Sequence, residues 1–172
     1  KSSDTSISFT PPLTLASQNT TGASVSIVFT ITTYSGSTDI GSNTKTINCS
    51  IPSSVKPTVS LSVSDSAGYA SKYGAYVQGV SKFKVAITAS GSYGSTIKTY
   101  KTTADGNSYT GASFTTNVVS GTGTLTINVT VTDSRGRTAT ASTTATVLAY
   151  TAPKITSFTV YRCDADGNSN SS

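Results

Sequence analysis

The stretch GTGTLTINVTVTDSRGRTATASTTATVL, at residues 121–148, decides the fold class. An apolar residue stands at every second position from Leu125 to Val131, with threonine or asparagine between. This period of two is that of a strand with one buried face. Asp133-Ser-Arg-Gly136 has the composition of a tight turn, and residues 138–148 then alternate again. The stretch therefore predicts two antiparallel strands joined by a short turn.

The composition of the whole chain favours an all-β fold. Of its 172 residues, 31 are serine and 33 are threonine, while glutamate and methionine, which favour helices, are absent. Threonine, valine, isoleucine and tyrosine favour strands. A serine- and threonine-rich composition is also typical of disordered, glycosylated stalks. The 35% of hydrophobic residues, their alternation and a total of only five prolines argue against such a stalk.

Residues 55–150 have the length and pattern of one β-sandwich. Asp105-Gly106 is a hairpin signal because both residues tolerate positive φ. About seven short strands with turns every 8–12 residues are typical of immunoglobulin-like and fibronectin-III-like antiparallel sandwiches. The alternation predicts strands at residues 58–63, 80–89, 95–101, 112–119, 125–131 and 138–148, with Tyr109 resuming the sheet before residue 112.

Residues 1–54 predict a smaller β-rich module. An alternating strand at 23–34 places Val25, Ile27 and Phe29 on one face, and a second strand follows at 43–51. These strands are few for a sandwich, so we expect the module to be N-terminally incomplete or completed by a neighbour. Prolines bracket residues 52–57, which predicts a semi-rigid hinge.

Residues 151–172 predict the start of a third β module. Residues 154–161 (KITSFTVY) repeat the alternating pattern of residues 56–63 (KPTVSLSV), and in both a proline, Pro153 or Pro57, precedes the alternating strand. This partial repeat suggests tandem modules joined head to tail. We expect the chain to be an excerpt from a longer protein.

The formal net charge of +5 is spread along the chain. The close pairs Lys82/Lys84 and Arg135/Arg137 are predicted to be solvated strips, because residues i and i+2 of a strand share a face. A nucleic-acid groove would need clustered basic residues with interleaved aromatics. No apolar run approaches the length that spans a membrane. We therefore expect neither nucleic acid nor a membrane as a partner.

The two cysteines are predicted to be buried free thiols. Cys49 shares a strand face with Ile47 and Ile51, which indicates a core position, and Cys163 lies in a different module. A disulfide framework would need more numerous and closer cysteines.

The residue types argue against an enzyme and against a cofactor. The chain has no histidine, which removes the common nucleophile–base systems and the usual zinc ligands. Without glutamate, a carboxylate pair could only be two aspartates. Asp164, Asp166 and Asn168 resemble a calcium loop weakly, but Gly167 stands two places too early and no glutamate follows. A polar hairpin turn is the preferred interpretation.

The best candidate for surface contact is the segment at residues 68–76. Tyr69 and Tyr73, with Lys72 between them, could stack on sugar rings or form a partner interface. The structural alternative, which we prefer, is that Tyr76 begins a strand and packs inward while the other tyrosines cover the end of the sandwich.

Three stretches resemble the minor structural proteins of siphophages that infect Gram-positive cocci. They are residues 33–45 (TYSGSTDIGSNTK) with 51–57 (IPSSVKP), residues 76–85 (YVQGVSKFKV) with 94–100 (GSTIKTY), and residues 131–137 (VTDSRGR) with 150–154 (YTAPK) and 160–162 (VYR). Together they span nearly the whole chain. The resemblance implies a virion tail component, a fibre or tail-tip protein carrying Ig-like repeats, and supplies no catalytic residues.

The expected function is that of spacer and adhesion modules in a phage tail near the host surface. The expected partners are other virion tail proteins and host cell-wall glycans, with any homo-oligomer formed through regions outside this chain. The rivals are a bacterial surface adhesin or stalk, located on the bacterial cell surface, and a non-catalytic module of a cell-wall hydrolase.

Overall fold

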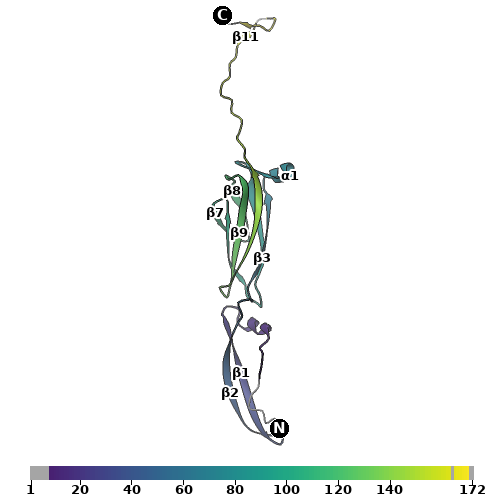
Figure 1. Ribbon diagram of the computed structural model, residues 1–172, viewed down its shortest axis with the longest axis vertical. Coiled ribbons are helices and arrows are strands. Elements are labelled where there is room, and N and C mark those ends of the chain that lie inside the picture. The colour runs from purple at the N-terminus through teal and green to yellow at the C-terminus, as the bar shows by residue number, and fades with distance from the viewer. Residues whose placement is uncertain (1–7, 164, 171–172) are drawn as a thin grey trace.

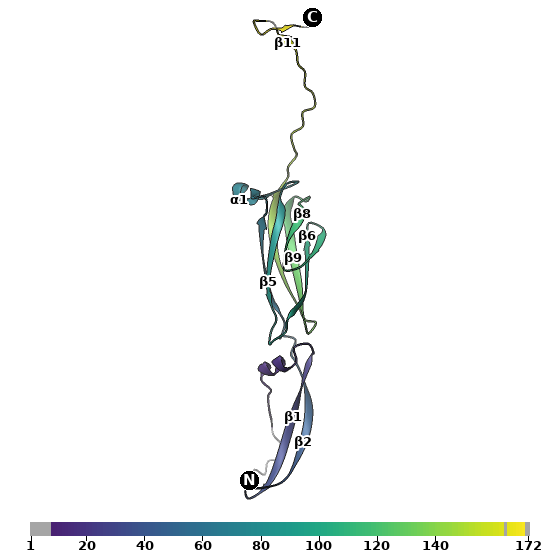
Figure 2. The same ribbon diagram turned by 180° about the vertical axis from the view of Figure 1, so that it is seen from behind.

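The computed structural model describes residues 8–163 and 165–170 and confirms the all-β prediction. Along its long axis lie a two-stranded ribbon, a β-sandwich and an extended C-terminal segment that ends in a small hairpin (Figure 1). The view from behind shows the same end-to-end arrangement (Figure 2). The helices among the described residues are the short 3-10 helix η1 (Leu13–Gln18) and α1 (Tyr69–Tyr73).

The middle of the chain forms a sandwich of two sheets. Its three-stranded sheet has the order β3-β5-β8, and its five-stranded sheet has the order β4-β10-β9-β6-β7. All pairings are antiparallel except the short parallel one between β4 and β10. The strands are β3 (Thr58–Asp65), β4 (Tyr76–Val77), β5 (Lys82–Ser90), β6 (Ile97–Ala104), β7 (Asn107–Thr110), β8 (Ser113–Val118), β9 (Gly123–Asp133) and β10 (Thr138–Leu148).

The core lies between the two sheets and follows the predicted alternation. Phe83 and Val85 of β5 and the row Ile127, Val129 and Val131 of β9 are all fully buried. Burying each of these side chains contributes about 1.5–3 kcal/mol relative to leaving it in water. The opposite face of β5 carries Lys82 and Lys84, both exposed as predicted.

Both predicted tight turns are present. Residues 133–137 join β9 to β10, and Gly136 there has a φ of 78°. Asp105 and Gly106 join β6 to β7 with φ values of 47° and 72°, the left-handed pair that a two-residue hairpin turn requires.

The N-terminal unit is a long ribbon of β1 (Ser24–Ser35) and β2 (Thr38–Ser50). Its apolar face is covered near the sandwich by η1, and further along by Phe9, whose ring lies 5.7 Å from that of Phe29. The face is open beyond that point, where Ile31 is 67% exposed. The buried cluster at the base consists of Ala16, Val25, Ile51 and Val55. Cys49 is half-buried rather than fully buried, and its thiol is free.

Residues 52–57 are not the hinge that the prolines predicted. Val55 and Pro57 are buried, and an arginine of the sandwich donates hydrogen bonds to carbonyls within this segment. The prolines therefore shape a packed connection rather than a free one.

The strand predicted at residues 154–161 is not formed. This segment is extended but unpaired, and Ile155, Phe158 and Val160 are 74–83% exposed. Alternation sets which side chains share a face, but a strand also needs a neighbour to accept its hydrogen bonds. Beyond it, β11 (Arg162–Cys163) pairs with β12 (Ser169–Asn170), and Cys163 is exposed, which corrects the prediction of a buried thiol.

Candidate functional site

The predicted tyrosine segment forms helix α1 at the end of the sandwich from which the C-terminal segment leaves (Figures 1 and 2). Gly68 and Gly74 bracket the helix in the left-handed conformation, with φ values of 80° and 72°. Tyr69 and Tyr73 are four residues apart and therefore share a helix face. Their rings are stacked, with centroids 6.2 Å apart and planes 10° apart. The Nζ of Lys72 lies 5.2 Å from the centroid of Tyr73.

The tyrosines line one side of a shallow apolar groove, which we call the tyrosine patch. Its opposite side is the end of β10 and the first residues after it, where Leu148 and Tyr150 are both nearly half exposed. The parallel pairing of Leu148 with Val77 brings these distant segments together. Sequence reasoning therefore found Tyr69, Lys72 and Tyr73 but missed the β10 side. The lining residues are Tyr69, Tyr73, Val77, Val80, Leu148, Ala149 and Tyr150.

Tyr76 does not belong to the patch, as the structural alternative predicted. It lies in β4 and packs edge-on against Phe83, with ring centroids 4.8 Å apart. Burial, followed by the negative charge of Asp65, raises the pKa of its phenol above the ordinary value.

Asp65 anchors α1 to the sandwich. Its carboxylate accepts hydrogen bonds from the backbone N–H groups of Ala67 at 3.0 Å and Ala70 at 3.1 Å, and from the hydroxyl of Ser81 at 2.8 Å. Burial opposes the charge and raises the pKa of this carboxyl, but the hydrogen bonds outweigh burial and the pKa lies below its ordinary value. Asp65 is thus the group that holds the tyrosines in place.

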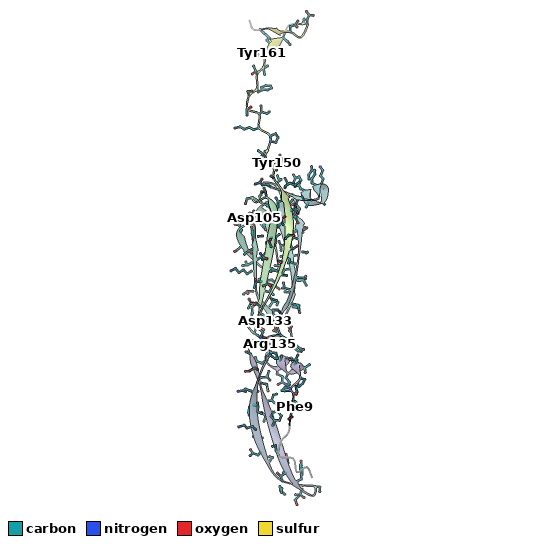
Figure 3. All side chains as sticks on the ribbon, in the orientation of Figure 1. Phe9, Asp105, Asp133, Arg135, Tyr150 and Tyr161 are labelled. Atoms are coloured by element: carbon teal, nitrogen blue, oxygen red, sulfur yellow. The ribbon has the colours of Figure 1, made fainter. Side chains whose placement is uncertain are left out.

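The second candidate site is the joint between ribbon and sandwich, and Arg135 is its centre. Figure 3 places Asp133 and Arg135 at the end of the sandwich that faces the ribbon. The Arg135 side chain is 9% exposed and donates to four backbone carbonyls. Two belong to the N-terminal unit, Asn19 at 3.0 Å and Ala16 at 2.7 Å. The others belong to the sandwich, Ser92 at 2.7 Å and Tyr93 at 2.8 Å.

Arg137 and Ser134 extend the joint. The guanidinium of Arg137 donates to the carbonyls of Ile51, Pro52 and Val55. The hydroxyl of Ser134 donates to the carbonyl of Thr20. One turn of the sandwich therefore holds the preceding unit through hydrogen bonds to several of its backbone carbonyls.

Asp133 fixes the shape of that turn. Its buried carboxylate accepts the backbone N–H groups of Arg135 at 3.0 Å and Arg137 at 2.9 Å, and the hydroxyl of Ser95 at 3.1 Å. The prediction that Arg135 and Arg137 form a solvated strip is wrong. Both belong to the turn and its exit rather than to an exposed strand face, and their acceptors lie more than 40 residues away in sequence.

The weak metal candidate lies at the far C-terminal end. Asp166 and Asn168 belong to the connection between β11 and β12, as the preferred hairpin interpretation predicted, and Asp164 lies outside the described residues. Within the part of the chain that the structure describes, no three Cys or Asp side chains are grouped as metal ligands would be.

Comparison with known families decides the origin of the chain. Residues 1–170 match the family described as siphovirus protein of unknown function (DUF859). The chain belongs to this siphovirus family. For this siphovirus protein, a comparison with curated proteins finds no match. The resemblance to siphophage proteins is thus confirmed at the level of the family. Among the residues described, the siphovirus protein has no helix long and apolar enough to cross a membrane.

Proposed function

We propose that this siphovirus protein is a non-catalytic structural component of the phage tail, in a fibre or the tail tip, that acts as a rigid spacer and adhesion segment near the host cell. The observation that carries the proposal is the joint. Arg135 binds carbonyls of the ribbon and of the sandwich at once, and Arg137 binds three more in the connection.

A joint of this kind suits a spacer. Units within one chain usually move relative to one another unless a substantial interface holds them. Hydrogen bonds from a charged group contribute about 1.5–3 kcal/mol each, and the forked guanidinium fixes direction as well as distance. Units stacked at a fixed angle fix the distance that the protein spans. Their end-to-end arrangement is that of a rod (Figure 1).

The strand order supports an Ig-like assignment for the sandwich. One sheet contains the first, third and sixth strands of the module, and the other has the last two antiparallel strands beside β6 and β7. The chain crosses between sheets after β5 and again on either side of β8, as in an immunoglobulin-type sandwich. Domains of this type recur as stiff repeats in extended surface proteins.

Membership of a siphovirus family favours the tail over the rival bacterial adhesin, stalk or cell-wall hydrolase module. The proposed partners are other tail proteins, with contact to host cell-wall glycans, and any homo-oligomer would form through regions outside these residues. The lack of histidine and glutamate supports a role without catalysis.

Immunogold electron microscopy tests the location. Antibodies raised against the purified 172-residue chain are applied to intact phage particles and to uninfected host cells. Gold on the tail is the expected result. Gold on the capsid, or a protein found in infected cells but absent from particles, contradicts the proposal, and gold on uninfected cells favours the adhesin.

A further inference from the structure

The outward face of β9 and β10 carries a ladder of uncharged polar residues, nearly all threonine, which we call the threonine face. Every outward position of β9 from Thr124 to Thr132 is threonine except Asn128. Every outward position of β10 from Thr138 to Thr146 is threonine except Ser142. The register places these residues directly opposite one another in five cross-strand pairs, from Thr132 with Thr138 to Thr124 with Thr146.

Composition alone does not account for this face. The outer surface of the other sheet is also rich in serine and threonine, but it carries Lys82, Lys84 and Ala86 on its central strand. On the threonine face all five pairs are uncharged. The neighbouring strand β6 adds Thr99 and Thr103, and its two charges are Lys98 and Lys101. Exposed sheet faces normally carry lysine or glutamate, whose charges help to keep a protein soluble. The paired positions of the threonine face have no such charges.

The spacing of the ladder is regular. Along each strand the outward side chains repeat about every 6.7 Å, and the two strands lie about 4.8 Å apart. Each threonine presents a hydroxyl that both donates and accepts, beside a methyl group. A polymer that recognises such a surface should also repeat, carry hydroxyls that donate and accept, and expose C–H groups.

The chemistry of the face argues against other classes of partner. Nucleic-acid sites have clustered lysine and arginine, and the cores of protein interfaces are enriched in aromatic residues and arginine. A membrane surface would need a basic or strongly apolar face. The face also has a shallow hollow at its middle, lined by residues 128–130 of β9 and 140–142 of β10.

We propose that the threonine face binds an extended, uncharged polysaccharide along the direction of β9 and β10, an inference that rests on the proposed location at the host surface. The central hollow takes one ring of the polymer, and the flanking pairs bind its hydroxyls. Each contact is weak, so binding gains strength from the number of rows engaged and from repetition in many copies on one virion.

The test uses cell walls of a Gram-positive coccus from which acid has removed the anionic phosphate polymers. These walls are mixed with the purified 172-residue chain, and the amount of protein that they remove from solution is measured. Saturable binding that added salt does not weaken is expected, because no charges take part. The variant T126V/T130V/T140V keeps shape and strand propensity but removes three hydroxyls, and it should bind about tenfold or more weakly. The matched control is T58V/T88V/T115V, three exposed threonines on the other sheet.

A second variant protects the test against misfolding or aggregation of the triple valine protein. S142K places a long side chain over the hollow and should cause a similar loss while circular dichroism and thermal unfolding stay those of the wild type. The proposal is overturned if the wild-type chain does not bind these walls, or if both variants bind as tightly as the wild type. It is also overturned if the single substitution Y73A, in the tyrosine patch, is enough to abolish binding. In each of these cases tail labelling in the immunogold experiment would still stand, leaving a spacer that does not use this face.

Discussion

Arg135 is the single residue on which the joint most depends. Replacing it with alanine removes the guanidinium hydrogen bonds to the carbonyls of Ala16 and Asn19, of which Ala16 keeps only the backbone N–H of Asn19. R135A should therefore lower the free energy of unfolding by about 2 kcal/mol or more. R135K should recover only part of this loss, because an ammonium lacks the planar fork. Urea unfolding, followed by circular dichroism, measures the stability of both variants. The matched control is R162A, which replaces an exposed arginine beyond the joint. Equal stability of R135A and R162A would show that Arg135 does not stabilise the fold.

Asp65 predicts a pH dependence at the opposite end of the sandwich. Its folded-state pKa lies below the unfolded value, so its charge stabilises the fold above the unfolded pKa. This stabilisation is lost as pH falls through the folded pKa. D65N should therefore unfold at a lower temperature than the wild type near neutral pH, and the difference should shrink in acid. Thermal unfolding across this range measures it, with the exposed D39N as control. A difference that grows in acid would contradict the assignment.

At the level of strands, Phe83 joins the two sheets of the sandwich. It is fully buried on β5 and meets Tyr76 of β4, which belongs to the other sheet. F83A should lower the free energy of unfolding by about 3–5 kcal/mol, because the cavity adds to the lost burial. V118A, on the neighbouring β8 and 41% exposed, should cost far less. Similar losses for both variants in urea unfolding would mean that Phe83 does not organise the core.

The strands of the sandwich could be predicted from the sequence because their signals are local. The alternation from Leu125 to Val131 and the residues of the two turns specify both the strands and their direction. Residues 154–161 have the same alternation but no neighbouring strand, so periodicity alone predicted a strand that is not formed. The pairing of β4 with β10 joins residues about 70 positions apart, and no local pattern indicates it.

The candidate sites divide in the same way. Tyr69 and Tyr73 could be identified because they lie close together in the sequence, whereas Tyr150 lines the patch only because of the path of β10. The role of Arg135 could not be predicted from spacing, since its acceptors are backbone carbonyls and carry no sequence signature.

At the scale of the whole molecule, the joint predicts that ribbon and sandwich tumble in solution as one elongated body. Backbone ¹⁵N relaxation of the 172-residue chain reports this directly, because amides of β1 and β9 should fit a single anisotropic rotation. In R135A/R137A the ribbon keeps the chain connection, the hydrogen bond from Ser134 to Thr20 and the small apolar cluster around Val55. Without the two guanidinium groups, its amides should relax as those of a smaller, faster body. R162A should leave the single rotation intact. Independent tumbling of ribbon and sandwich in the wild type would contradict the rigid spacer, since a loosely linked chain sets no fixed reach. A shared rotation that survives in R135A/R137A would assign the rigidity to the buried connection at residues 52–57 instead of to the two arginines.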